Sequence, residues 1–183
     1  GYIFQTSPFL EYSNHQYKAM KNAYAGHLKY SFQLRPHTVA DQAYIGAYQG
    51  IGVGYFNFGN PEELGNPLAV YLFQGGRIAQ FSPRISLNYE WNFGASFGWK
   101  PYDEYDNPEN QIIGSKVNAY LNVNLYLKWA LSPKFDLMIG TTGSHFSNGN
   151  TQYPNSGLNT VDCKVGLVYN FNRRADELAQ SWQ

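Results

Sequence analysis

A histidine and a serine two residues apart are the strongest candidates for chemistry in this chain. His145 and Ser147 end a stretch, starting at Phe135, in which their parity is apolar at Phe135, Leu137 and Ile139. In an extended strand, side chains at i and i+2 share one face, about 6.5–7 Å apart at the backbone. An imidazole at that distance can activate a serine hydroxyl, so the pair predicts nucleophilic catalysis. The same spacing also fits a histidine and a serine that are merely solvated at the rim of a sheet.

The elements that must position this pair are long strands with strict alternation. Between residues 84 and 100, aromatic and aliphatic side chains alternate with Ser, Asn, Glu and Gly, and the pattern returns between residues 116 and 129. A period of two is typical of a strand. These strands exceed the ~5–6 residues common in soluble sheets. One apolar and one polar face favour a transmembrane barrel, with lipid outside and a polar interior.

Weaker alternating segments complete the predicted sheet. They lie at residues 2–12, 26–34, 42–58, 68–74, 135–147 and 158–171, which brings the number of strands to eight. An even number suits a closed bacterial barrel. Closure leaves no edge strand, whose unpaired backbone N–H and C=O groups could not form hydrogen bonds in lipid. The fold class predicted is therefore all-β: an eight-stranded antiparallel transmembrane β-barrel over residues 1–171, with periplasmic termini. Residues 172–183 are expected to form a periplasmic tail, either a short helix or disordered.

The lengths of the connections predict which end of the barrel faces outward. The short link at residues 131–134 is expected to be a periplasmic turn. Residues 57–67, 101–113 and 148–157 are rich in Pro, Asn, Gly and acidic residues, as longer outer loops are. His145 and Ser147 then lie on the lipid face near the outer rim.

Composition excludes several other classes of protein. No apolar run approaches the ~18–20 residues of a transmembrane helix. The 13 basic and 13 acidic residues balance, so no nucleic-acid partner is expected. His15, His27 and His37 lack the spacing of metal ligands, and we expect no metal and no cofactor. The string Gly50, Gly52 and Gly54 lies within a strand and is interpreted as relief of crowding inside the barrel.

A local motif connects the His–Ser pair to a known family. Residues 145–148 read His-Phe-Ser-Asn and residues 154–157 read Pro-Asn-Ser-Gly. This pattern resembles the signature of the PagL-type lipid A 3-O-deacylases, outer-membrane barrels that remove an ester-linked acyl chain from lipopolysaccharide. The resemblance implies a carboxylic ester hydrolase in the bacterial outer membrane, with its active site facing the outer leaflet. It further implies lipid A as substrate and membrane lipids as surroundings, while a homodimer is left open.

The resemblance also implies roles for individual residues. His145 would be the general base and Ser147 the nucleophile, while Asn148 and Asn155 would support the oxyanion, where amide donors are chemically apt. The acid of the family, a glutamate on the last strand, falls on Asn159 here. An amide carbonyl can orient an imidazole but stabilises the imidazolium less than a carboxylate does. We therefore expect slower catalysis or an inactive relative.

Two acids and two alternative functions complete the expectations. Asp136 and Asp162 have the opposite parity and are expected to point into the interior and form ion pairs there. The first alternative is a non-catalytic outer-membrane barrel with a structural, adhesive or lipid-binding role, which retains the fold of the family without its activity. The second is a soluble ligand-carrying barrel, which would bury Phe97, Leu125 and Cys163 under other protein.

Overall fold

Strands make up the regular structure of the described residues. The computed structural model describes residues 2–5, 12–13, 16–17, 23–33, 46–171 and 173. The strands are β1 (Tyr2–Gln5), β2 (Tyr12–Ser13), β3 (Gln16–Tyr17), β4 (Tyr24–Gln33), β5 (Tyr48–Asn57), β6 (Gly65–Ser82), β7 (Ile85–Trp99), β8 (Val117–Ala130), β9 (Phe135–Ser147) and β10 (Leu158–Tyr169). Within these described ranges, no helix is long and apolar enough to cross a membrane.

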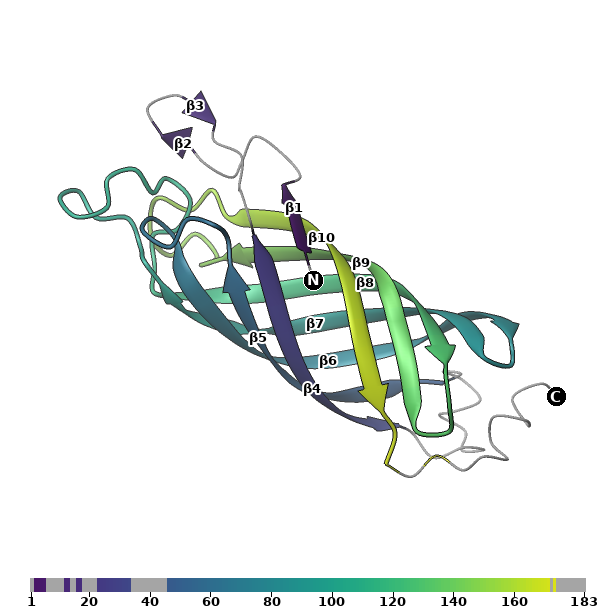
Figure 1. Ribbon diagram of the computed structural model, residues 1–183. Helices are drawn as coiled ribbons and strands as arrows, with labels where there is room; N and C mark the ends of the chain where they lie inside the picture. The colour runs from purple at the N-terminus through teal and green to yellow at the C-terminus, as the bar shows by residue number, and fades with distance from the viewer. Residues whose placement is uncertain are drawn as a thin grey trace.

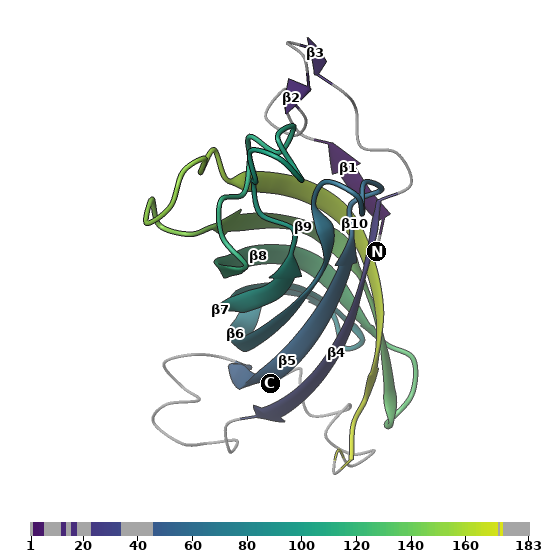
Figure 2. The same ribbon diagram turned by 90° about the vertical axis from the view of Figure 1, so that its left-hand side faces the viewer.

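The long strands β4 to β10 form one antiparallel sheet in which each strand pairs with the next along the chain. Figures 1 and 2 show this sheet curling around an interior. The short β1 lies between the two edge strands of this sheet, β10 and β4. It forms four residue pairs with β10, and its Tyr2 pairs with Tyr24 of β4. The strand order thereby returns to its start. The predicted all-β, antiparallel fold is confirmed.

The observed strands follow the alternation closely, with one clear exception. The strands predicted at residues 84–100, 116–129 and 135–147 are β7, β8 and β9. In contrast, β6 runs from Gly65 to Ser82, far beyond the predicted residues 68–74. Register shifts between Arg77 and Ala79 and between Gln80 and Ser82 explain the error. Such bulges place extra residues on one strand and interrupt the period of two.

Parts of the prediction fall on residues that the structure does not describe. The strand predicted at residues 2–12 is seen as β1, and residues 6–11 lie outside the described residues. The strand predicted at residues 42–58 is seen as β5, and residues 42–45 lie outside them as well. The same holds for the predicted tail at residues 172–183, apart from Arg173.

The two ends of the sheet differ in their connections (Figure 1). At one end, called the loop end here, residues 58–64, 100–116 and 148–157 connect consecutive strands. At the other, the turn end, residues 83–84 and 131–134 make short links. Among the described connections, long and short ones are therefore distributed between the two ends as the sequence predicts. Ser147 ends β9 at the loop end.

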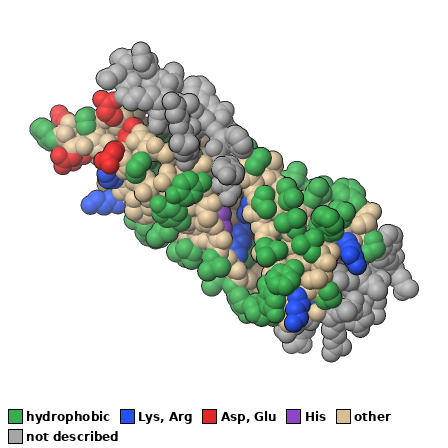
Figure 3. Space-filling model, viewed as in Figure 1, with side chains coloured by type: hydrophobic (Ala, Val, Ile, Leu, Met, Phe, Trp, Pro, Cys, Tyr) green, Lys and Arg blue, Asp and Glu red, His purple; other side chains and the backbone are tan. Residues whose placement is uncertain are grey.

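Apolar side chains cover the outside of the sheet, and Figure 3 shows them spread over the surface between the two ends. Val123 is 65% exposed, Leu125 48% and Phe97 45%. Cys163 is exposed as well. A soluble barrel that carries a ligand would cover Phe97, Leu125 and Cys163, so their exposure disfavours that alternative.

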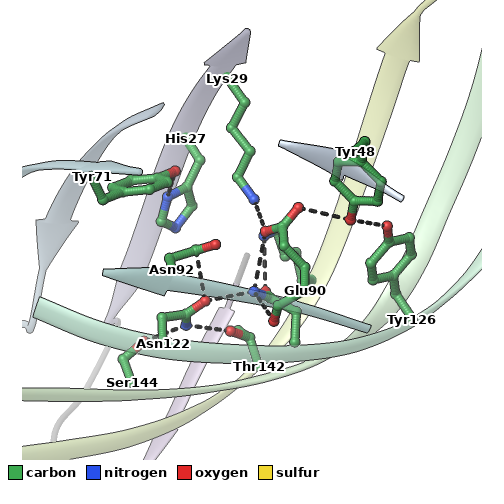
Figure 4. A network of polar contacts seen from close by, with 12 residues as sticks. His27, Lys29, Tyr48, Tyr71, Glu90, Asn92, Asn122, Tyr126, Thr142 and Ser144 are labelled. Carbon is green, nitrogen blue, oxygen red and sulfur yellow. Dashed lines mark hydrogen bonds and ion pairs between the residues drawn. The ribbon is translucent and has the colours of Figure 1, made fainter. Parts of the chain in front are cut away.

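The interior is polar in its central part. Glu90 accepts hydrogen bonds from Lys29, with which it forms an ion pair, and from Tyr48 at 3.1 Å (Figure 4). Asn124 also donates to Glu90, at 3.2 Å. Glycine makes room for the rings of this region: a Cβ at Gly52 would lie 2.4 Å from the Tyr71 ring. The interpretation of the Gly50–Gly54 string as relief of crowding is therefore confirmed.

Near the loop end, an apolar cluster fills the interior. It includes Phe56, Phe58, Trp99, Tyr120 and Phe146, each at most 4% exposed. At the turn end, the buried Asp136 pairs with Arg173 at 2.7 Å. Asp162 is also buried, at 5% exposure. The predicted inward orientation of both acids is thus correct. Of the predicted ion pairs, the described residues show one for Asp136, with a partner from beyond β10, and none for Asp162.

Candidate active site

A line of three polar side chains lies on the outer face of the sheet where β9 and β10 approach the loop end. The strand register sets Asn159 of β10 directly opposite His145 of β9. Nδ1 of His145 lies 2.8 Å from Oδ1 of Asn159, and Nε2 lies 3.0 Å from Oγ of Ser147. The structure therefore joins the three residues that the sequence predicted as catalytic into one hydrogen-bonded series.

The partners of the imidazole determine which of its nitrogens carries the proton. Oδ1 of Asn159 is a carbonyl oxygen and can only accept, so Nδ1 of His145 must be the donor. In the neutral ring, Nε2 is then the acceptor, and it receives the hydroxyl hydrogen of Ser147. This is the tautomer that a general base needs when it removes a proton from serine.

The series contains no carboxylate. Asn159 supplies an orienting dipole rather than a negative charge, so the imidazolium that forms on proton transfer would gain less stabilisation than from an acid. Asp162 lies further along β10, but its side chain is buried on the inner face. It therefore cannot replace the missing acid from its own strand position.

The predicted oxyanion residues lie in the loop that follows Ser147. The backbone N–H of Asn148 donates to Oδ1 of Asn155 at 3.1 Å. The side chain of Asn148 donates to the carbonyl of Gln152 at 2.8 Å and accepts from the N–H of Thr151 at 3.2 Å. Asn148 thus organises the loop with its own amide. Because Asn148 directly follows Ser147, its backbone N–H holds the side chain of Asn155 next to the serine.

Gly157 forms the surface against which the imidazole packs. Its φ of +71° lies in the left-handed region that favours glycine. A Cβ here would lie 3.2 Å from Cε1 of His145 and 3.2 Å from the carbonyl oxygen of Phe146. The sequence identified Gly157 only as part of a motif. The structure shows that the absence of its side chain lets the loop approach the ring.

Phe146, between the histidine and the serine, points to the opposite side of the sheet. It is fully buried and its ring centroid lies 5.1 Å from those of Phe56, Trp99 and Tyr120. Because alternate side chains of a strand point to opposite faces, anchoring Phe146 inside directs its two neighbours outward. The motif His-Phe-Ser therefore has one inward side chain that anchors the strand and two outward side chains that are hydrogen-bonded to each other.

A shallow hollow of about 350 Å³ runs beside His145 on the outer surface. Leu121 and Val123 of β8 and Val161 of β10 form its walls. Gly143 of β9 pairs with Val123 and with Val161 and so lies between them. A Cβ at Gly143 would meet only the carbonyl oxygen of Thr160, at 3.9 Å. The hollow exists because this outward position of β9 has no side chain. The sequence contains a signal for this hollow, because Gly143 has outward parity and lies two residues before His145. The prediction did not use this signal.

The described residues offer no grouping suited to a metal ion. Among them, no three His, Cys, Asp or Glu side chains come together as ligands would. The polar atoms at the site are an imidazole, a hydroxyl and amides, which are groups that can take part in proton transfer and nucleophilic attack.

The fold and the site together define a class of protein: an antiparallel sheet that curls around a polar interior, with a serine, a histidine and an asparagine joined in series on its apolar outer face. The chain belongs to the lipid A 3-O-deacylase (PagL) family, whose family model matches residues 29–168. That span includes every predicted site residue, and the predicted family is confirmed. The family comprises ester hydrolases of the outer membrane that act on lipid A. Searches of curated proteins and of solved structures found no match.

Proposed function

We propose that this protein is an esterase of the bacterial outer membrane that removes the 3-O-linked acyl chain of lipid A. The observation that carries the proposal is the hydrogen-bonded series Asn159–His145–Ser147 on the outer face. Family membership supports lipid A as the substrate class. An apolar surface around the site suits a substrate that is itself a membrane lipid and reaches the enzyme laterally.

In the proposed reaction, Ser147 is the nucleophile. Its Oγ attacks the carbonyl carbon of the ester while its proton passes to Nε2 of His145. When the tetrahedral intermediate collapses, the bond to the sugar oxygen breaks, and that oxygen takes the proton from Nε2. A water molecule then attacks the acyl-serine, again giving a proton to His145, and releases the fatty acid as Ser147 recovers its hydrogen.

Asn155 is the donor that we assign to the oxyanion. Its Oδ1 accepts the N–H of Asn148, which fixes the amide plane beside Ser147. Within the described residues, no hydrogen bond engages its Nδ2. A preorganised amide N–H is the kind of group that stabilises charge appearing in the transition state. Asn148, whose side chain is used inside the loop, contributes by shaping it.

The hollow beside Gly143 is the place that we assign to the acyl chain of the substrate. It begins at His145 and is walled by the aliphatic side chains of Leu121, Val123 and Val161. None of the described residues that line it is Asp, Glu, Lys or Arg. An acyl chain lying there would present its ester to Ser147 with little loss of apolar contacts to the membrane.

The setting proposed for this reaction is a closed eight-stranded barrel that spans the outer membrane, with the loop end outside and the termini in the periplasm. Outward apolar side chains such as Val123 and inward polar ones such as Asn92 and Asn122 support it, since a barrel in lipid needs this distribution. Strand closure by β1 supports it as well.

One observation favours a second function, a non-catalytic outer-membrane barrel that binds lipid or has an adhesive or structural role. Asn159 stands where the family resemblance places an acid. If the asparagine does not support turnover, the hollow and the loops would remain as a lipid-binding surface.

Incubation with lipopolysaccharide separates the two functions. Purified protein in detergent is mixed with lipopolysaccharide, and the lipid A is analysed by mass spectrometry. Loss of one 3-hydroxyacyl chain with wild type and none with Ser147→Ala is the result expected of the esterase. Identical spectra from the two proteins would refute it and leave the non-catalytic function.

A further inference from the structure

A buried asparagine far from the serine in sequence connects three parts of the loop end. Asn110, in the β7–β8 connection, is fully buried. Its Nδ2 donates to the carbonyls of Glu63 at 3.2 Å and Lys100 at 2.7 Å. Its Oδ1 accepts the N–H groups of Ile112 and Ile113, both at 3.0 Å. The side chain of Asn110 thus connects the β5–β6 loop and the end of β7 to the segment that follows Asn110 in the chain, residues 111–113.

That segment in turn contacts the loop that follows Ser147. The carbonyl of Ile112 accepts the N–H of Gly157 at 3.3 Å. The carbonyl of Gln111 accepts the hydroxyl of Ser156 at 3.1 Å. Ile112 and Ile113 are themselves buried in the apolar cluster. The position of Gly157 therefore depends on a neighbouring loop as well as on its own.

Gly157 is the last link before the imidazole. As described above, a Cβ on this residue would lie 3.2 Å from Cε1 of His145. Asn159 and Ser147 hold the two ring nitrogens, and Gly157 lies against the ring edge between them. If Gly157 moved away, the ring would be free to tilt, and Nε2 would leave the line to Oγ.

We propose that Asn110 is a positioning residue for His145 and acts through Ile112 and Gly157. The inference rests on the proposed function, in which His145 is the general base. Asn110 contacts neither the ring nor the serine, so its loss leaves substrate binding intact and misaligns the base. For Asn110→Ala we expect kcat to fall roughly 10- to 100-fold, since a displacement of about 1 Å can cost that much. KM should change little.

Asn107 provides a matched control. Its side chain donates to the carbonyls of Glu63 at 2.9 Å and Lys100 at 3.2 Å, two of the acceptors that Asn110 uses. Its side chain makes no hydrogen bond to Ile112 or Ile113 in the described structure. Asn107→Ala should therefore weaken the same loop junction without releasing Gly157, and kcat should stay near the wild-type value.

The test combines kinetics with a direct view of the imidazole. Protein carrying carbon-13 at Cε1 of its 4 histidines is placed in detergent micelles, and the His145 signal is assigned with His145→Gln. We expect Asn110→Ala to shift or broaden that signal and lower kcat, and Asn107→Ala to do neither. Asn110→Ser retains an oxygen able to accept a nearby N–H, so both kcat and the His145 signal should return part of the way to their wild-type values. This variant also replaces Asn110→Ala in the test if the alanine variant fails to fold.

The outcomes separate the inference from the proposed function. An unchanged His145 signal in both Asn110 variants, or equal changes in Asn110→Ala and Asn107→Ala, would overturn the positioning role. A wild-type protein that leaves lipid A intact would refute the esterase, whereas the imidazole signals would still decide whether Asn110 positions the ring.

Discussion

Asn159 is the residue at which this site departs from the acid implied by its family resemblance. Its Oδ1 accepts from Nδ1 of His145 at 2.8 Å, so it sets the tautomer that a base requires. What it lacks is the negative charge that would stabilise the imidazolium. At this scale, the geometry of the site and its electrostatics can be tested separately.

Asn159→Asp keeps the shape of the side chain and adds the charge. A hydrogen bond to a charged group is worth ~1.5–3 kcal/mol against ~1 kcal/mol for a neutral one, so the rate of deacylation should rise roughly 2- to 30-fold. The measurement is kcat on lipid A, with Asn159→Ala as the control that removes the orienting carbonyl and should lower the rate. A fall in rate with Asp would show that charge at this position is not what limits catalysis.

Gly143 should determine whether an acyl chain fits beside the base. Gly143→Val places a branched side chain in the hollow, and we expect KM for lipid A to rise about 10-fold or more, given ~0.8 kcal/mol per buried CH₂ displaced from contact. Labelling of Ser147 by a small fluorophosphonate should continue. Thr141→Val, on the same face one outward position further from the serine, is the matched control. Unchanged KM in Gly143→Val would place the acyl chain elsewhere.

The sequence predicted which three residues of the candidate site lie together, but not the residues that support them. Two residues on one strand, and a third on the next, can be aligned by parity alone, which is why His145, Ser147 and Asn159 meet as expected. The contacts of Gly157 and Asn110 were not predicted, because they depend on how two loops pack together. Loop packing has no period that a sequence reveals.

At the scale of elements, strand β9 carries the site on one face and is anchored by the other. Phe146 lies within 5.7 Å of four ring centroids in the apolar cluster. The strands with unbroken alternation were predicted almost to the residue. β6 was not, because the bulges near Arg77 and Gln80 disrupt the pattern from which a strand is recognised.

Phe146→Ala should reduce both stability and activity. Removing a buried phenylalanine typically costs ~3–5 kcal/mol, and the loss would let the end of β9 move. Urea unfolding in detergent, followed by tryptophan fluorescence, measures the first effect, and deacylation measures the second. Phe93→Ala, on the outer face at 55% exposure, should change stability far less. Equal losses from the two variants would contradict an anchoring role for Phe146.

At the scale of the whole molecule, the outer face and the central part of the interior show the reverse of a soluble protein's distribution of side chains. Apolar residues cover the outside, and asparagines, Glu90 and Lys29 lie within (Figures 3 and 4). Alternation in the sequence predicts this arrangement but not the partners inside, since cross-barrel contacts such as Lys29 with Glu90 join strands that are not neighbours.

Val123→Lys tests whether lipid contacts the outer face. Val123 lies near the middle of β8 and is 65% exposed. A lysine at the midplane of a bilayer costs a barrel ~2–4 kcal/mol, so the variant should unfold at a lower urea concentration in lipid vesicles. Thr151→Lys, in the exposed loop after Ser147, should not. Equal midpoints would indicate that position 123 does not face the hydrocarbon.

The central claim, that His145 and Ser147 act as one catalytic unit on lipid A, is tested most directly by the rate of 3-O-deacylation in single and double variants. Residues that act as a unit are strongly non-additive: Ser147→Ala and His145→Ala should each lower the rate by about 10³-fold or more, and the double variant should lose no more than either. A rate that survives in Ser147→Ala, or losses that multiply in the double variant, would contradict the claim.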